Sequence, residues 1–275
     1  MTEITIQLDD STSDKISYSS VGFLKFENND REAEPGGTGV FARLGKIRGI
    51  ITAGHVLEHL PQVGRIGLVR FPGTDSQLQN YRIEMLYTDE IMLWSKVEGS
   101  APDLGFLLLP EIEASAIEAR GAVFFNLGKA RDFAVSAPNR RMAKTYAIVG
   151  VVAEWAEDVL VAPRAKKKII GGLFGAAKIT KEFKEKNVDL VEIEIDYSSS
   201  PRIPKSYEGV SGGALWELHA ELDGTKVVNV GKRLYGIAFR QSKETDHHFI
   251  VSNGPSTLES LKTAICKKWP DASAN

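Results

Sequence analysis

The chain has 275 residues, and its 34 Lys and Arg residues nearly balance its 36 Asp and Glu residues, for a formal net charge of -2. This balance argues against a protein that binds nucleic acid or an anionic membrane through bulk positive charge. No uninterrupted apolar run approaches the ~18 residues that a membrane-spanning helix needs, and residues 1–10 lack the basic and apolar regions of a secretory signal.

Cys266 is the only cysteine, so the chain cannot form an intramolecular disulfide. Structural disulfides persist in oxidising compartments and are rare in the cytosol. We therefore expect a cytoplasmic protein. Cys266 falls within an expected helix, where a small, partly buried residue is ordinary, so it has no expected catalytic role.

Short strand-like runs dominate the first half of the chain. Residues 2–18 mix polar and acidic residues with short apolar runs, which leaves a frayed lead-in and an edge strand as open alternatives. Beyond them, runs of apolar and β-branched residues are separated by Gly, Pro, Asp and Ser, with no long amphipathic helix between them, which is typical of antiparallel β structure. The expected strands are residues 21–26, 39–44, 47–53, 66–71, 81–87, 91–97, 104–109 and 123–127.

The second half repeats this pattern after a polar, irregular connector at residues 128–141. Residues 165–175 are expected to form a flexible basic loop. Pro255 opens a terminal amphipathic helix that runs through Trp269, and Pro270 ends it. The expected strands of this half are residues 146–152, 159–162, 188–195, 213–218, 233–239 and 248–251.

One serine lies between glycines in the sequence Gly-Val-Ser-Gly-Gly at 209–213. Attack on a carbonyl requires a reactive oxygen together with backbone N–H groups that stabilise the oxyanion as it forms. Glycine at 209 permits the tight turn that would aim those groups. Glycine and serine clusters most often mark ordinary loops, so Ser211 needs a partner base before it can be interpreted as a nucleophile.

A histidine and an aspartate with suitable contexts precede this serine. The sequence Thr-Ala-Gly-His ends at His55, and Asp-Leu-Gly-Phe-Leu begins at Asp103. Together with 209–213, these blocks resemble the three signature blocks of trypsin-like (chymotrypsin-fold) serine peptidases. Their order, His then Asp then Ser, differs from that of subtilisins and α/β-hydrolases. The single cysteine makes the resemblance greater to intracellular bacterial members than to secreted ones.

The resemblance implies an all-β fold of two packed antiparallel six-stranded β-barrels with a C-terminal helix. The whole chain, residues 1–275, would be one peptidase domain. Its N-terminal barrel would span about 19–130 and carry His55 and Asp103, its C-terminal barrel would span about 142–254 and carry Ser211, and the helix would span 255–269. Ser211 would attack, His55 would act as general base and then acid, Asp103 would orient His55, and the N–H groups of Gly209 and Ser211 would bind the oxyanion. No cofactor is implied.

Three further residues are expected to contact substrate. The resemblance places Lys205 at the base of the specificity pocket, where it would select an acidic residue; the alternative is that Lys205 points to solvent and the pocket is apolar, favouring aliphatic residues. Phe239 and Arg240 end a run that resembles the strand that pairs with substrate backbone. Phe239 stands where many relatives have a small polar residue supporting the catalytic aspartate.

The function expected from these residues is that of a serine endopeptidase acting on a protein or peptide substrate. The alternative is a catalytically silent or partner-activated module that keeps a peptide groove; any activating partner is unknown. Val210 precedes the serine where zymogen-activated trypsins have aspartate, so activation by a new amino terminus is not expected. No nucleic acid or membrane partner is expected. The remaining histidines, His219, His247 and His248, match no recognised spacing of metal ligands, so no metal site is expected.

Overall fold

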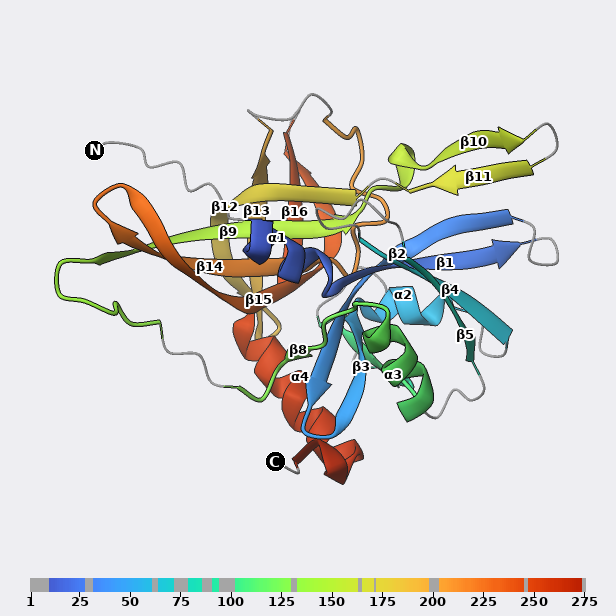
Figure 1. Cartoon of the computed structure of the whole chain (residues 1–275), viewed down its shortest axis with the longest axis horizontal. Coiled ribbons are helices and arrows are strands. Elements are labelled where there is room, and N and C mark those ends of the chain that lie inside the picture. The colour runs from blue at the N-terminus through green and yellow to red at the C-terminus, as the bar shows by residue number, and fades with distance from the viewer. Residues whose placement is uncertain are drawn as a thin grey trace.

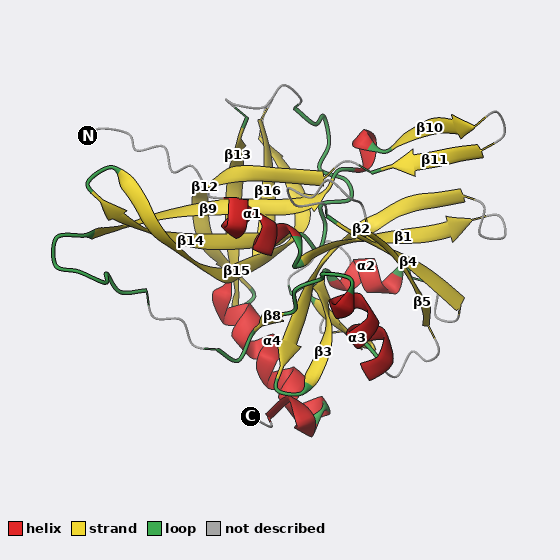
Figure 2. Ribbon diagram, in the orientation of Figure 1, coloured by secondary structure: helices red, strands yellow, loops and turns green. Residues whose placement is uncertain are grey.

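The computed structural model describes residues 10–27, 32–60, 64–71, 79–85, 91–93, 102–129, 133–162, 165–170, 172–197, 203–244 and 247–273. Strands make up most of the described chain, in two β halves that pack side by side, with few helices (Figures 1 and 2). This is the expected all-β class with a C-terminal helix.

The first half is a sheet whose strands run in the order β5-β4-β1-β2-β3-β7-β6, with β8 paired to β2 off this path. Neighbouring strands on the path are antiparallel, whereas β8 lies parallel to β2. β8 follows a helix, so no tight turn imposes an antiparallel direction on it. The bounds are β1 Ser20–Glu27, β2 Glu32–Leu44, β3 Ile47–Thr52, β4 Gly64–Arg70, β5 Gln79–Met85, β6 Ile91–Leu93, β7 Gly105–Leu108 and β8 Phe125–Asn126.

The second half is a closed six-stranded barrel, in the order β12-β13-β16-β15-β14-β9. The hairpin β10–β11 forms a separate two-stranded sheet (Figure 1). Closure leaves the barrel without free edges over its paired length. The bounds are β9 Arg141–Val151, β10 Glu157–Ala162, β11 Ala165–Ile169, β12 Gly172–Glu185, β13 Val188–Asp196, β14 Ala214–Asp223, β15 Lys226–Glu244 and β16 His247–Asn253.

Four α-helices and two 3-10 turns are described between and beyond these strands. α2 follows β3 directly, α3 lies between β7 and β8, and α4 follows β16 (Figure 2). No helix in the described ranges is long and apolar enough to cross a membrane. The bounds are α1 Asp10–Ser17, α2 Gly54–Glu58, α3 Glu111–Ala119, α4 Pro255–Lys268, η2 Ala153–Trp155 and η3 Pro270–Ser273.

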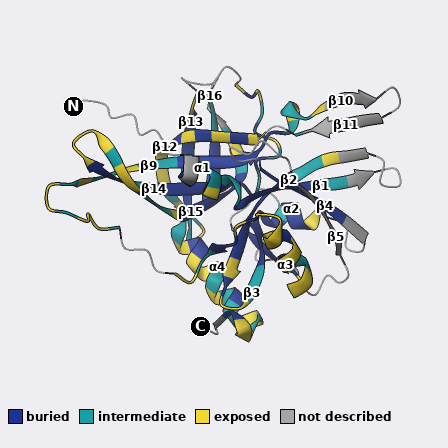
Figure 3. Cartoon of the chain, viewed as in Figure 1, coloured by how far each residue is buried: buried dark blue, intermediate teal, exposed yellow. Residues whose placement is uncertain are grey.

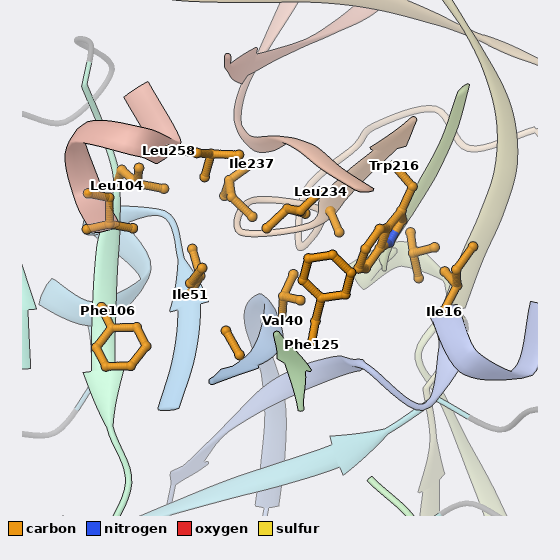
Figure 4. Packing of buried hydrophobic residues seen from close by; sticks show 14 of the residues in the cluster. Ile16, Val40, Ile51, Leu104, Phe106, Phe125, Trp216, Leu234, Ile237 and Leu258 are labelled. Carbon is orange, nitrogen blue, oxygen red and sulfur yellow. The ribbon is translucent and has the colours of Figure 1, made fainter. Parts of the chain in front are cut away.

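Buried side chains form continuous cores that cross from one half to the other (Figure 3). In one of them, Val40 and Phe125 of the first half share a cluster with Trp216 and Ile237 of the barrel (Figure 4). The Phe125 and Trp216 rings meet edge to face at 4.9 Å. Because apolar burial is the main favourable term in folding, this shared core holds the two halves in one relative position.

The connector between the halves is attached to polar residues of β14. The ring of Phe133 stacks on His219 at 3.9 Å, and the backbone N–H of Ser136 donates to the buried carboxylate of Glu221. Burial raises the pKa of Glu217 on the same strand, but hydrogen bonds from Arg233 and His219 more than offset this, so its pKa lies below the ordinary value. The carboxylates of Glu217 and Glu221 on β14 are therefore buried with partners.

Two segments differ from the sequence expectation. Residues 10–17 form helix α1, not an edge strand: Ile16 is buried in the shared core, and the hydroxyls of Ser19 and Ser20 donate to the carbonyls of Lys15 and Ile16 in its last turn. Much of the expected flexible loop at 165–175 belongs to strands β11 and β12. Both segments gain their order from packing and pairing that their polar composition does not indicate.

The buried face of helix α4 packs in the shared core, so truncating its side chains should destabilise the protein. We expect Leu261→Ala to lower the free energy of unfolding by about 2–5 kcal/mol, because Leu261 is buried in that core. Urea unfolding measures the change. The matched control Lys267→Ala alters an exposed residue of the same helix and should change little; equal losses in both variants would contradict this role for α4.

Candidate active site

The pairing of β3 with β7 brings His55 and Asp103 together. The two strands are antiparallel, and Thr52 at the end of β3 lies opposite Gly105 at the start of β7. Residues that follow Thr52 therefore approach residues that precede Gly105. His55 lies in the first turn of α2, just beyond β3, and Asp103 lies just before β7. Antiparallel register thus explains how two residues far apart in sequence meet.

Asp103 holds His55 through two hydrogen bonds. The backbone N–H of His55 donates to Asp103 Oδ1 at 2.9 Å, and the ring Nδ1 is hydrogen-bonded to Asp103 Oδ2. The Asp103 side chain is 2% exposed and that of His55 is 18% exposed. Since an ionised carboxylate can only accept, Nδ1 carries the ring proton and Nε2 is left as a base. No described residue forms a hydrogen bond with Nε2.

Ser211 lies in a turn that continues the ladder between β14 and β15. Ala238 donates to the carbonyl of Gly213 at 2.8 Å, and Gly212 donates to the carbonyl of Ala238 at 2.6 Å. Gly212 has a φ of +87°, and a Cβ on it would lie 1.8 Å from the Thr38 carbonyl oxygen. Only glycine fits this backbone position, which explains the second glycine of the motif.

The N–H groups of Gly209 and Ser211 have no hydrogen-bond acceptor within the described chain. The carbonyl of Glu208 accepts from Ala153 N–H at 2.8 Å, and the carbonyl of Val210 accepts from Gly213 N–H at 2.7 Å. In a planar trans peptide the N–H points opposite to the C=O. Because the carbonyls of Glu208 and Val210 are held in this way, the N–H groups of Gly209 and Ser211 point in the opposite directions, away from Ala153 and Gly213.

The Ser211 hydroxyl points to the Phe239 carbonyl, to which Oγ donates at 3.4 Å. This distance is long for a hydrogen bond between two oxygen atoms. Ser211 and His55 are both described, and Ser211 Oγ does not form a hydrogen bond with His55 Nε2. The structure therefore brings the aspartate and histidine into contact, whereas the described hydrogen bonds of Ser211 are with Phe239 and Thr38.

The residues expected to contact substrate have different environments. Phe239 and Arg240 line a small pocket beside Ser211, with a volume of about 20 Å³, whereas exposed Lys205 is not among its lining residues. Arg240 forms an ion pair with Glu185 at 3.0 Å. Apolar side chains of the wall come from Val210 and Ile250. Lys205 therefore lies outside the lining of this pocket, and its role stays a prediction.

Phe239 is buried against the α2 side of the core and offers no polar support to Asp103. Asn253 at the end of β16 contacts the aspartate instead: its Nδ2 donates to the backbone carbonyl of Asp103 at 2.9 Å. Asn253 is fully buried and links the barrel to the segment that carries Asp103. The sequence analysis did not identify Asn253, because an asparagine before glycine indicates only a turn.

Comparisons with known proteins do not identify the function of this chain. No protein-family model matches the sequence, and no curated protein matches it. One of the solved structures that resemble the chain is a crystal structure of the Rv3671c protease in its inactive form. It aligns over 93% of this chain and 91% of that chain, with 12% sequence identity and a TM-score of 0.44.

Two glycines with positive φ allow the fit of the serine turn to be tested. We expect Gly224→Ala to lower the free energy of unfolding by about 1–2 kcal/mol, since its φ is +60° and no atom lies near its added Cβ. Gly212→Ala should lower the free energy of unfolding by about 1–3 kcal/mol more than Gly224→Ala does, because the added Cβ overlaps Thr38 and Thr52. Urea unfolding compares the two; equal losses would show that the turn tolerates a side chain.

Proposed function

We propose that the chain is a serine endopeptidase in which Ser211, His55 and Asp103 act together. The observation that carries the proposal is the buried Asp103 carboxylate, which binds both the backbone N–H and the ring of His55 and leaves Nε2 available. A histidine held in this tautomer is the general base that a serine hydroxyl needs. The unbonded N–H groups of Gly209 and Ser211 support the same chemistry.

The reaction would proceed through an acyl-enzyme. Ser211 Oγ forms a bond to the carbonyl carbon of the substrate while His55 Nε2 takes the hydroxyl proton, and the N–H groups of Gly209 and Ser211 donate to the resulting oxyanion. The C–N bond then breaks as His55 transfers the proton to the leaving amine. Water, deprotonated by His55, attacks the ester and releases the acid with Ser211 restored.

Substrate would bind as an added β-strand along β15. Up to Ile237, β15 pairs with β14, but from Arg240 onward its described ladder partners lie on β16 alone. The opposite edge of Phe239, Arg240 and Gln241 therefore faces the Ser211 side with no described strand beside it. Backbone pairing with a peptide at such an edge is a common mode of recognition.

A second candidate is a latent or silent form of the same fold, and the orientation of the Ser211 hydroxyl favours it. In this conformation Oγ is bonded to the Phe239 carbonyl and not to the base. A bound peptide that pairs with β15 would compete for that carbonyl. The latent form thus differs from the active one in a side-chain rotation at Ser211, with the turn already ordered.

Covalent labelling tests the proposed function directly. We expect a fluorophosphonate probe to label wild-type protein at Ser211, Ser211→Ala to abolish labelling, and His55→Ala to slow it by about 10²-fold or more, the usual contribution of a general base. Mass spectrometry of the labelled peptide gives the site. Ser260→Ala, on the exposed face of α4, is the matched control. An unlabelled wild type would overturn the peptidase proposal and support the silent module.

We further propose that the pocket selects a small apolar residue before the scissile bond. Its volume is about 20 Å³, and the positive charge of Arg240 is paired with Glu185. Burial raises the pKa of the Tyr207 phenol in its wall, so this group remains neutral. A pocket of this size without an unpaired charge favours alanine or valine over glutamate.

Matched peptide substrates with valine or glutamate before the scissile bond test this preference. We expect the ratio of kcat/KM for the two peptides to favour valine, and Lys205→Ala to leave that ratio unchanged, because Lys205 is exposed and lies outside the pocket lining. Lys226→Ala removes the same charge from an exposed hairpin and is the control. A selective loss of glutamate cleavage in Lys205→Ala alone would show that Lys205 reads an acidic residue.

A further inference from the structure

Thr38 of β2 has an unusual set of contacts for a strand residue. It is fully buried, and its backbone N–H donates to the carbonyl of Ser211 at 2.7 Å. Its hydroxyl Oγ1 donates to the carbonyl of Gly209 at 2.7 Å. Thr38 thus reaches from the first half into the serine turn of the barrel and binds both residues whose N–H groups are unbonded.

The direction of the Thr38 hydroxyl is determined by its second contact. The backbone N–H of Val151 donates to Oγ1 at 2.8 Å, so this oxygen is already an acceptor. The hydroxyl has one proton, and the nearby acceptor for it is the Gly209 carbonyl. Thr52 completes the arrangement by donating its own hydroxyl to the Thr38 carbonyl at 2.5 Å. All polar groups of Thr38 therefore have a partner.

These bonds restrain the peptide planes on both sides of each unbonded N–H. On the N-terminal side, the Glu208 carbonyl is held by Ala153 and the Val210 carbonyl by Gly213 of the turn itself. On the C-terminal side, Thr38 is the one residue of the described chain that holds the carbonyls of Gly209 and Ser211. Fixing both flanking planes fixes φ and ψ of a residue, and with them the direction of its N–H.

We propose that Thr38 is a positioning residue for the oxyanion-binding groups, an inference that rests on the proposed function. Thr38 holds Gly209 and Ser211 in the conformation that aims their N–H groups at the reacting carbonyl. Through Thr52, which lies on the strand leading to His55, it also aligns this turn with the base. Neither contact touches the substrate, so Thr38 acts through Gly209 and Ser211.

The substitution Thr38→Val removes the hydroxyl with little change in shape and keeps the bond from the Thr38 N–H to Ser211. We expect kcat to fall by about 10-fold or more with KM within about twofold, because full loss of one oxyanion donor costs about 10²–10³-fold in kcat. Thr38→Ser restores the hydroxyl and should restore kcat. Thr257→Val is the matched control: it removes another buried hydroxyl, at the start of α4, which donates to Asp189 of β13.

Amide hydrogen exchange provides a readout that does not require activity. In Thr38→Val we expect faster exchange at Val210 and Gly213, whose N–H groups bond within the turn, with exchange elsewhere unchanged. Three outcomes would each overturn the inference. They are unchanged exchange at these two amides, exchange that becomes faster throughout the protein in both Thr38→Val and Thr257→Val, and faster exchange in the turn with kcat unchanged. A wild type without activity, together with local loosening in Thr38→Val, would overturn the peptidase proposal and leave the positioning role supported.

Discussion

The candidate site depends on the apolar seam between the two β halves, by which we mean the buried clusters that contain residues of both halves. His55 and Asp103 belong to the first half and Ser211 belongs to the barrel, so no strand pairing within one sheet can place all three. Phe239 packs in one core with residues of α2, and Trp216 and Leu258 pack in another with residues of β2 and β3. Because protein interiors are close-packed, these clusters leave little freedom for the halves to shift relative to each other.

Hydrogen bonds then refine the alignment that the seam establishes. Thr38 and Asn253 both donate across the seam, the first to the serine turn and the second to the carbonyl of Asp103. Each is fully buried, so the loss of either donor's partner would be costly, and the bond that each donor makes favours a single arrangement. The packing thus brings the halves together, and the crossing bonds fix the serine turn and Asp103 against the opposite half.

Much of the fold, and the contact between His55 and Asp103, could be predicted from the sequence. The strands that lead to His55 and Asp103 are short apolar runs bounded by turn residues, and such runs are legible in a single sequence. Glycine at 209 indicates a tight turn in the sequence, and in the structure it adopts a positive φ, which glycine accepts without strain. A single sequence therefore reveals residues that local backbone geometry requires, and residues that belong to a regular apolar pattern.

Residues that act across the seam could not be found in this way. Nothing in the local sequence distinguishes Thr38 from any other threonine in a strand, since its partners Gly209 and Val151 are distant in the chain. The strand β12 was missed for a different reason: it does alternate, with Leu173 and Ala177 facing inward, but glycines and lysines interrupt the pattern. Sequence reasoning therefore recovers local constraints and loses those that depend on tertiary contacts.

The energetics of the Ser211 hydroxyl decide how the active and latent forms are related. A normal hydrogen bond contributes about 0.5–1.5 kcal/mol net, and the bond to the Phe239 carbonyl, at 3.4 Å, is longer than the normal range. Breaking it therefore shifts the population by at most about tenfold, since 1.4 kcal/mol corresponds to a factor of ten. A peptide that pairs with β15 would occupy this carbonyl and could supply that energy itself. Because the turn that carries the N–H groups is already held on both sides, the substrate alone would convert the latent form into the active one, and the proposed mechanism requires no separate activator.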